Sequence, residues 1–347
     1  MPVRNEERFI ARNLEAVLAQ EYPPHRLEVL VADGRSDDRT REIVERIAAR
    51  VAREGSGATV TLVDNPERIM PTGTNAALRR ARGDVVVLLG GHAELPRDYL
   101  ARCVDVLLAS GADGVSGAIE SVGSGPVGRA IAAAMSSPFG IGNSGFRTAS
   151  ADGAPVEVDT IPFPVFRRDV FERVGLYNPA MVRHQDYEFN YRVRRAGGRM
   201  LLLPGLRAVY HVRGSLPALW RQYWQYGVWK GRFLRRHPQS LRFRHLVPPA
   251  FVLGVAGALA LALVAPATWP LAAALGGAYL AFVALGMAAF AARGRWDVVP
   301  WLPAVMVCLQ FGYGLGVWLG LALPRVPDAP PWTPARAADA ARGEGGN

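Results

Sequence analysis

The chain has 347 residues, half of them hydrophobic, and a formal net charge of +10. No acidic residue lies between Glu188 and Asp297, so most of this charge belongs to a basic block at residues 192–244, and an uncharged apolar region begins at Val247. This uneven distribution, with only two cysteines, excludes a uniformly soluble enzyme, a disordered chain and a disulfide scaffold. A basic block beside apolar segments favours a membrane surface over nucleic acid as partner.

The opening residues 2–7 are typical of the loop that follows a strand, and a helix is expected from about Glu7 to Gln20. A doubly wound sheet opens with a strand, which is missing here. We therefore expect the chain to begin inside what is normally the first strand. The N-terminus is charged and does not resemble a signal peptide.

Strands and helices alternate up to about residue 210. The apolar runs predict strands at 27–32, 60–63, 84–89 and 206–212, and helices at 39–54 and 72–81. This alternation predicts a parallel sheet covered by helices. Ligands of such sheets bind outside the carboxyl ends of the strands, so the polar residues that follow each strand are candidate site residues.

Asp33 follows the strand at 27–32 and is the first such candidate. Gly34 allows a tight turn, and Ser36 or Asp37 can cap the next helix. The Asp33 carboxylate could then accept hydrogen bonds from a sugar hydroxyl or a base N–H. A strand, a turn and a capped helix without any ligand explain the same residues, and the pattern alone leaves both readings open.

The C-terminal third is expected to enter a membrane. Residues 213–246 form a segment in which Trp and Tyr alternate with basic residues, suited to the lipid headgroup layer. Uncharged runs at 247–265, 269–292 and 298–323 are each long enough to cross a bilayer. Arginines precede the first run and separate the second from the third, so domain 1–212 is expected in the cytoplasm and the tail 324–347 outside, disordered.

Six motifs in a fixed order resemble those of the family-2 inverting glycosyltransferases, and in detail the bacterial membrane-bound succinoglycan-type glucosyltransferases. They are Pro2 to Glu7; Asp33-Gly34 with Ser36, Asp37 and Thr40; Gly73 with Asn75 and Arg82-Gly83-Asp84; Met135 to Asn143; Gln185 to Arg192; and Gln222 to Gly227. Each motif is weak alone, but the ordered set covers residues 1 to about 235.

The resemblance implies an α/β fold of the A-type glycosyltransferases, Rossmann-like with a mostly parallel sheet, followed by three transmembrane helices. It also implies transfer of a sugar from a nucleotide-diphosphate donor with inversion. The residues that it places at the donor are Pro2, Val3, Arg4, Asn5, Glu6, Asp33, Asn75 and Gly91.

The resemblance places the general base at Asp186, with Glu188 able to share the role. Inversion is a direct displacement, so one carboxylate is needed to take the proton of the acceptor hydroxyl. The surrounding basic residues favour an ionised Asp186. A structural alternative is that Asp186 caps its helix or pairs with Arg192 or Arg194.

The expected metal motif after the strand at 84–89 is altered. Gly90 stands where the first metal-binding Asp is expected, whereas His92 fits the second position. Three explanations stay open. His92, with Glu94 and His211, binds Mn²⁺ or Mg²⁺; basic residues such as Arg192, Arg213 and Arg221 replace the metal; or the chain has lost transfer activity and serves as a subunit of an active transferase.

The acceptor side departs from the processive members of the family. Gln222, Gln225 and Tyr226 stand where these have Gln-x-x-Arg-Trp, so a single sugar addition is expected. These residues and Asn143 are expected to meet the acceptor or its phosphate. We expect a polyprenyl-diphosphate-linked saccharide as acceptor, in exopolysaccharide or cell-envelope glycan synthesis with assembly partners.

Overall fold

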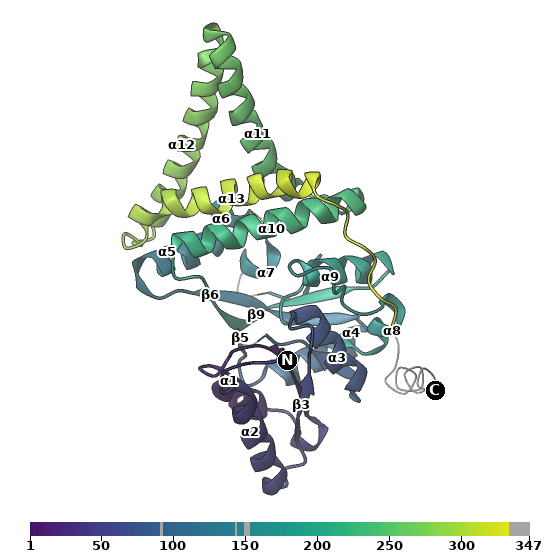
Figure 1. The fold of residues 1–347 in the computed structure, drawn as a ribbon. Coiled ribbons are helices and arrows are strands. Elements are labelled where there is room, and N and C mark those ends of the chain that lie inside the picture. Colours follow the sequence, from purple (N-terminus) through teal and green to yellow (C-terminus); the bar gives the residue numbers. More distant parts are fainter. Residues whose placement is uncertain (91–92, 143, 149–152, 333–347) are drawn as a thin grey trace. The chain divides into compact units, whose positions relative to one another are not determined.

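The computed structural model describes residues 1–90, 93–142, 144–148 and 153–332 (Figure 1). The chain forms two compact units. The first unit comprises Met1–Ile119, Ala149–Tyr210 and the chain from Pro327, and the second comprises Glu120–Thr148 and His211–Val326.

The first unit opens with a three-stranded parallel sheet. Its strands are β1 (Pro2–Val3), β2 (Glu28–Asp33) and β3 (Thr59–Asp64), in that order. The connecting segments hold α1 (Ile10–Leu18), the 3-10 turn η1 (Pro24–Arg26), α2 (Thr40–Glu54) and α3 (Met70–Arg80). The predicted strands and helices are confirmed here, and a two-residue β1 pairs with the end of β2.

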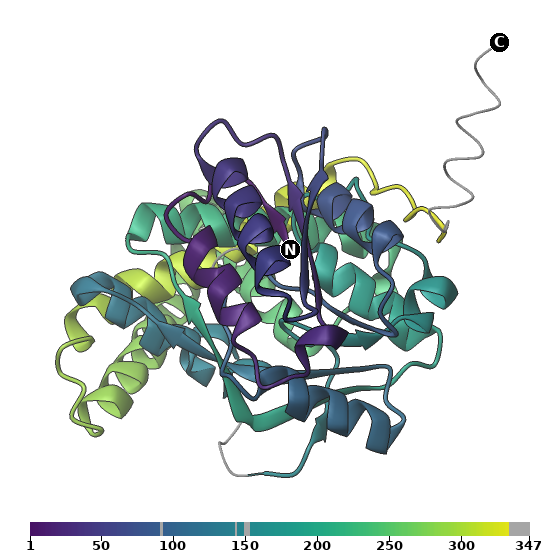
Figure 2. The same ribbon diagram turned by 90° about the horizontal axis from the view of Figure 1, so that it is seen from below.

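Helices cover both faces of this sheet because side chains alternate along β2. Val29 and Val31 pack in one cluster with residues of α1 and α2, such as Ile10 and Val44. Ala32 packs on the other face with Ala77 of α3. Figure 2 shows these helices on opposite sides of the strands.

A second sheet, which mixes parallel and antiparallel pairs, completes the first unit. Its strand order is β4 (Val85–Val87), β8 (Val165–Arg167), β6 (Gly114–Val122), β9 (Met200–His211) and β5 (Ala93–Glu94), with β7 (Val156–Glu157) paired to β9. The parallel arrangement that alternation predicts thus holds throughout the first sheet, whereas in the second sheet β8 pairs antiparallel with β4 and β6, and β5 and β7 pair antiparallel with β9. Alternation reveals local structure, whereas β4 pairs antiparallel with β8, which lies far along the chain.

Helices α4 (Tyr99–Ser110), α8 (Asp169–Val174) and α9 (Gln185–Arg195) accompany this sheet. An aromatic cluster fixes α9: the Phe189 ring stacks on Tyr177 at 4.6 Å and on Phe171 at 5.1 Å between centroids. Stacked aromatic rings add to the stability that their burial provides, so this cluster fixes the position of α9.

Residues 327–332 return to the first unit. The Asn178 side chain donates to the Pro327 carbonyl at 2.7 Å, and the Leu176 N–H donates to the Pro330 carbonyl at 3.1 Å. Trp332 packs beside Phe171. The predicted disorder of the tail is therefore wrong for residues 327–332, because hydrogen bonds and a ring contact hold them. Residues 333–347 lie outside the described residues.

The second unit is helical. It contains α5 (Gly125–Met135), α6 (Pro138–Ile141), α7 (Gly145–Thr148), α10 (Leu216–Arg236), α11 (Phe243–Val264), α12 (Trp269–Ala291) and α13 (Leu302–Ala322), with 3-10 turns η2 (Pro238–Ser240), η3 (Pro266–Thr268) and η4 (Val299–Trp301). Three segments are long and apolar enough to cross a membrane: Phe243–Val264, Pro266–Ala291 and Val299–Ala322. Within this unit, α11 and α12 form a hairpin, and α10 lies beside α13 (Figure 1).

Candidate functional site

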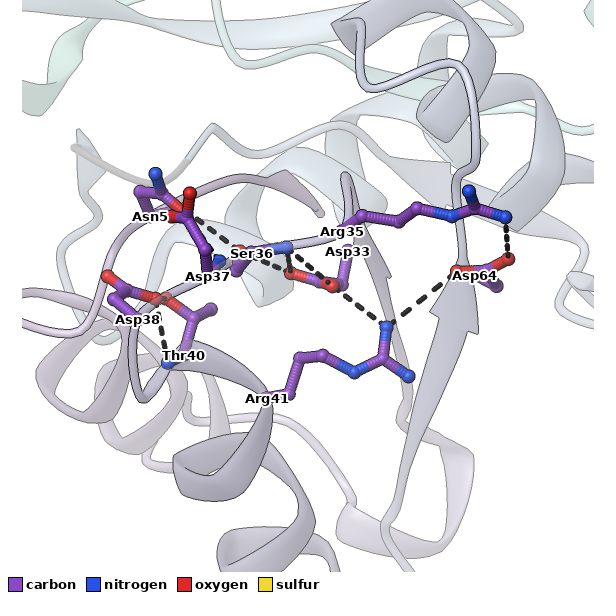
Figure 3. A network of polar contacts seen from close by, with 9 residues as sticks. All are labelled: Asn5, Asp33, Arg35, Ser36, Asp37, Asp38, Thr40, Arg41 and Asp64. Atoms are coloured by element: carbon purple, nitrogen blue, oxygen red, sulfur yellow. Dashed lines mark hydrogen bonds and ion pairs between the residues drawn. The ribbon is translucent and has the colours of Figure 1, made fainter.

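Hydrogen bonds join the loops after β1 and β2 at the carboxyl edge of the parallel sheet (Figure 3). The Asn5 N–H donates to Ser36 Oγ at 2.9 Å, and the Asp37 N–H donates to Asn5 Oδ1 at 3.1 Å. The Glu6 N–H donates to Thr40 Oγ1 at 2.7 Å. Five residues from two separate motifs thus form one polar network where ligands of such sheets bind.

Asp33 is the centre of this network. Its side chain has no exposed surface, and its oxygens accept the Ser36 hydroxyl at 2.5 Å, the Ser36 N–H at 3.1 Å and Arg41 Nη1 at 2.9 Å. A buried carboxylate needs such donors to replace water. Both Asp33 oxygens are engaged by the protein, so a ligand hydroxyl reaches this carboxylate only by displacing Arg41 or Ser36.

Asp64 is a site candidate that the sequence reasoning did not single out. It ends β3 directly opposite Asp33, and its side chain is 53% exposed. Arg41 lies 3.7 Å and Arg35 4.0 Å from its oxygens. The signal was present in the sequence, since Asp64 is the polar residue that directly follows a predicted strand.

The other expected donor residues divide into exposed and structural ones. Arg4 and Asn5 are exposed, and Glu6 and Pro2 are partly exposed. Val3 is buried in the core between the sheet and α1, so its side chain is not available to a ligand, which corrects that expectation. Gly91 lies outside the described residues.

Asn75, another expected donor residue, has a structural environment. It is buried in α3, its Nδ2 donates to the Tyr177 carbonyl at 2.7 Å, and its Oδ1 accepts the Tyr177 N–H at 2.9 Å. Both ends of the amide are used on one residue. Asn75 therefore holds the segment before α9, and its contact with the donor stays a prediction.

Asp186 occupies the first turn of α9 and is exposed to solvent. Its Oδ1 accepts the Tyr187 N–H at 2.8 Å, and among the described residues it has no ion-pair partner, so the alternative pairing with Arg192 or Arg194 is not seen. Desolvation by the surrounding protein raises the pKa of Asp186, against the opposing backbone hydrogen bonds. The result is an accessible carboxylate that binds a proton more readily than an ordinary Asp.

Glu188, two residues further on, is buried away from solvent. Its side chain is 5% exposed, and its oxygens accept Arg192 Nε at 2.7 Å and Arg192 Nη2 at 3.0 Å. Arg192 also donates to the carbonyls of Val174 and Leu176. This pair joins α9 to the segment after α8 and leaves Glu188 little exposed surface, so its expected share in the base role stays a prediction.

The described residues do not supply a complete metal site. No group of three His, Cys, Asp or Glu side chains gathers among them, and Gly90 offers no ligand. Glu94 lies 2.7 Å from Arg12 in an ion pair. His211 ends β9 and is exposed, and His92 lies outside the described residues. The ligand set expected for Mn²⁺ or Mg²⁺ is thus not assembled in the part described, and we derive no step through a metal.

The expected acceptor residues lie on α10 of the second unit. Gln222 is buried and its Nε2 donates to the Tyr226 hydroxyl at 3.0 Å, one turn along the helix. Gln225 and Tyr226 are partly exposed. An open hollow of about 430 Å³ lies at the start of this helix, lined by Pro217, Trp220, Arg221 and Trp224. Asn143 lies outside the described residues.

Comparisons with known proteins give consistent similarities. The family model described as glycosyl transferase family 2 matches residues 1–175. The succinoglycan biosynthesis protein ExoA of Rhizobium meliloti (strain 1021) is 32% identical over 264 residues, which are 75% of this chain and 76% of that protein. The glycosyltransferase AglE of Haloferax volcanii is 28% identical over 120 residues, 35% of this chain and 38% of that protein.

Among solved structures, the mannosyltransferase PcManGT from Pyrobaculum calidifontis in complex with GDP-Man and Mn²⁺ superposes with a TM-score of 0.55. It shares 23% sequence identity, and the match covers 88% of this chain and 84% of that one. This likeness concerns the fold, and it agrees with the A-type architecture that the ordered motifs predict.

Proposed function

Because the chain belongs to glycosyl transferase family 2, we propose that it moves one sugar from a nucleotide-diphosphate sugar to a lipid-linked saccharide, with inversion at the anomeric carbon. The reaction would serve exopolysaccharide or cell-envelope glycan synthesis. One observation carries the proposal: Asp186 is an exposed carboxylate with a raised pKa and no cationic partner among the described residues.

Asp186 is the general base of the proposed reaction. The acceptor hydroxyl oxygen forms a bond to the anomeric carbon while the bond from that carbon to the diphosphate oxygen breaks on the opposite face. The hydroxyl proton passes to an oxygen of Asp186. An arginine paired with this carboxylate would lower its proton affinity, so the pairing of Arg192 with Glu188 leaves Asp186 suited to the task.

Three residues with little exposed surface position the base rather than touch the substrate. Arg192 ties α9 to the carbonyls of Val174 and Leu176, and Asn75 ties the backbone of Tyr177 to α3. A rigid support of this kind holds a reacting group in a productive orientation, so little entropy is lost in orienting it during the reaction. Glu188 belongs to this support through Arg192.

The donor is proposed to bind at the edge formed by the loops after β1, β2 and β3. Arg4, Asn5 and the half-exposed Asp64 offer a cation, an amide and a carboxylate there. A divalent ion, Mn²⁺ or Mg²⁺, would supply charge neutralisation for the leaving diphosphate. Its ligands are a proposal from the family resemblance, with His92 and His211 as the candidates.

The acceptor is proposed to lie at the membrane on the cytoplasmic side. The hollow on α10 combines the rings of Trp220 and Trp224 with the cationic Arg221, which suits an isoprenoid chain that carries phosphate. The arginines between α12 and α13, Arg293 and Arg295, favour the cytoplasm for that loop. The acceptor's saccharide and the donor's sugar are left to a substrate screen.

The test uses the full chain in membranes with labelled nucleotide sugars, a lipid extract as acceptor, and a titration of Mn²⁺ and Mg²⁺. Asp186→Asn is expected to lower the transfer rate by about 10²–10⁴-fold while donor binding is kept. Asp169→Asn, which removes an exposed acid from the first turn of α8, is the matched control and should keep the rate.

A wild-type rate in Asp186→Asn would overturn the assignment of the base. If the wild-type protein binds no nucleotide-diphosphate sugar with either metal, the transferase proposal fails, and a non-catalytic subunit that partners an active transferase becomes the better description.

A further inference from the structure

The number of times the chain crosses the membrane is fixed by where it leaves and re-enters the first unit. It leaves after Tyr210 and returns at Pro327, and residues of the returning segment accept hydrogen bonds from Asn178 and Leu176. All three candidate spans lie between these points. A segment that contacts the first unit lies on the same side of the membrane, so the number of crossings is even, and three crossings are excluded.

The start of α13 is also held on the side of the first unit. Asp297, just before α13, lies 3.0 Å from Arg129 of α5. Helix α5 belongs to Glu120–Thr148, an excursion from the first unit that is shorter than the roughly 40 residues two crossings need. Both ends of α13 are therefore tied to segments on one side.

Helix α10 runs beside α13 in the same direction. A Cβ on Gly312 would lie 3.4 Å from the Trp220 carbonyl oxygen, one on Gly316 2.3 Å from that of Trp224, and one on Gly320 2.1 Å from that of Val228. The contacts advance together along both helices, which makes the pair parallel. Small residues at four-residue spacing permit this close approach of the two backbones.

The parallel direction excludes four crossings as well. If α10, α11, α12 and α13 crossed in succession, each would run opposite to the one before, so the first and the fourth would be antiparallel. The observed pair is parallel. Of the even numbers, two crossings by consecutive helices fit both the direction and the contacts.

The arginines of α10 indicate how deeply the helices α10 and α13 can enter the membrane. The last turn and a half of α10 carries Arg232, Arg235 and Arg236, which donate to the carbonyls of Pro324, Leu323 and Val326 beyond the end of α13. Arginines are costly in the hydrocarbon core. The burial of the three apolar segments supports the same conclusion. Half of the segment in α13 is buried inside the protein, against 22% for α11 and 11% for α12.

We propose that the membrane is crossed by the hairpin α11–α12 alone, and that α10 and α13 lie together in the interface on the side of the first unit, against anionic lipid headgroups. Residues 327–332 then lie on the same side as the first unit, whereas the sequence predicts the tail outside. No acid lies between residues 189 and 296, so no carboxylate within α10 neutralises its arginines, and their positive charge suits anionic headgroups.

The experiment labels single cysteines with a membrane-impermeant maleimide in the full-length protein after Cys103→Ala and Cys308→Ala. The positions are Ala267→Cys between α11 and α12, Trp296→Cys between α12 and α13, and Ala329→Cys in the returning segment. Inverted vesicles expose the cytoplasmic face and spheroplasts the outer face, and labelling after detergent solubilisation shows that each thiol reacts.

We expect positions 296 and 329 to be labelled from one face and position 267 from the opposite face. Labelling of 329 from the face that labels 267 would overturn the proposal, because three helices would then cross. This result does not depend on catalysis, so it is separate from the test of Asp186.

A second measurement tests the helix pair itself. Gly316→Ala places a methyl group 2.3 Å from the Trp224 carbonyl oxygen, whereas Gly257→Ala on α11 meets nothing within 4 Å. We expect Gly316→Ala to lower the melting temperature of the protein in anionic lipid nanodiscs and Gly257→Ala to leave it unchanged or raise it. Equal effects of the two substitutions would contradict the close packing of α10 and α13.

Discussion

Two acidic residues of the first unit, Asp33 and Asp186, each lie in one of the family motifs, but their environments in the structure are opposite. Asp33 is fully buried and accepts hydrogen bonds from Ser36 and Arg41. Asp186 is exposed and accepts a hydrogen bond from the Tyr187 N–H. The difference shows that a motif identifies where a carboxylate is needed, and that its hydrogen-bond partners decide whether it holds the fold or remains available to a substrate.

The region around Asp186 repeats this contrast at closer range. Glu188 lies two residues away on the same helix, but it points into the interior and binds Arg192 through both oxygens. Neutralisation of Arg192 by Glu188 keeps a guanidinium near α9 without placing it on the proposed base. The availability of Asp186 therefore depends on the buried pair, and the following substitutions examine that dependence.

The largest effect on stability is expected from Arg192→Met. This substitution leaves Glu188 buried without a partner and removes the bonds to two carbonyls, which is expected to cost about 3–5 kcal/mol of unfolding free energy. Arg46→Met is the matched control, since Arg46 pairs with Glu42 at the same i,i+4 spacing but both side chains are about two-thirds exposed. Its cost should stay near or below 1 kcal/mol. Denaturant unfolding in detergent compares the two, and similar costs would show that Glu188 is hydrated.

Asn75→Ala is expected to have the next largest effect. It removes two buried hydrogen bonds to Tyr177, at a cost of roughly 1–3 kcal/mol, and loosens the segment that carries α9. If Asn75 positions the base, kcat falls and the KM for the donor is little changed. Steady-state kinetics at several donor concentrations separate the two constants. A raised KM with an unchanged kcat would return Asn75 to the donor site.

A smaller effect is expected from Asp33→Asn. The amide keeps the shape but weakens acceptance from Arg41 and Ser36, so we expect a loss of about 1–2 kcal/mol. Asp64→Asn alters the half-exposed carboxylate beside it and should change stability by no more than about 0.5 kcal/mol. Thermal unfolding measures both. If Asp64→Asn proves as destabilising as Asp33→Asn, the two carboxylates do not differ in role as their environments indicate.

Local structure was predictable because the relevant signals are local. The helix expected at 39–54 is observed at Thr40–Glu54, and the strand expected at 60–63 is observed at Thr59–Asp64. The family resemblance and the A-type fold are confirmed by the family match and by the solved mannosyltransferase. Periodicity and turn residues carry this information within windows of about 10 residues.

Features that depend on distant parts of the chain were not predictable in the same way. The pairing of β4 with β8 joins residues about 80 positions apart, and the Asn75–Tyr177 bonds span 102. The i,i+4 spacing of Glu188 and Arg192 is a local signal, but no spacing rule selects the carbonyls of Val174 and Leu176 that complete this environment. Asp64 is different, because its place directly after the strand expected at 60–63 marks it as a candidate from the sequence alone.

The direct test of the central claim is the pH dependence of kcat for transfer, measured under conditions where the protein stays folded. Desolvation raises the pKa of Asp186 above the ordinary 3.8, so the carboxylate becomes protonated, and inactive as a base, while the pH is still above that value. The account predicts that kcat falls on the acid side with an apparent pKa above 3.8, and that the residual activity of Asp186→Asn lacks this decline. An identical acid-side decline in Asp186→Asn would contradict the account, because another group would then carry the proton.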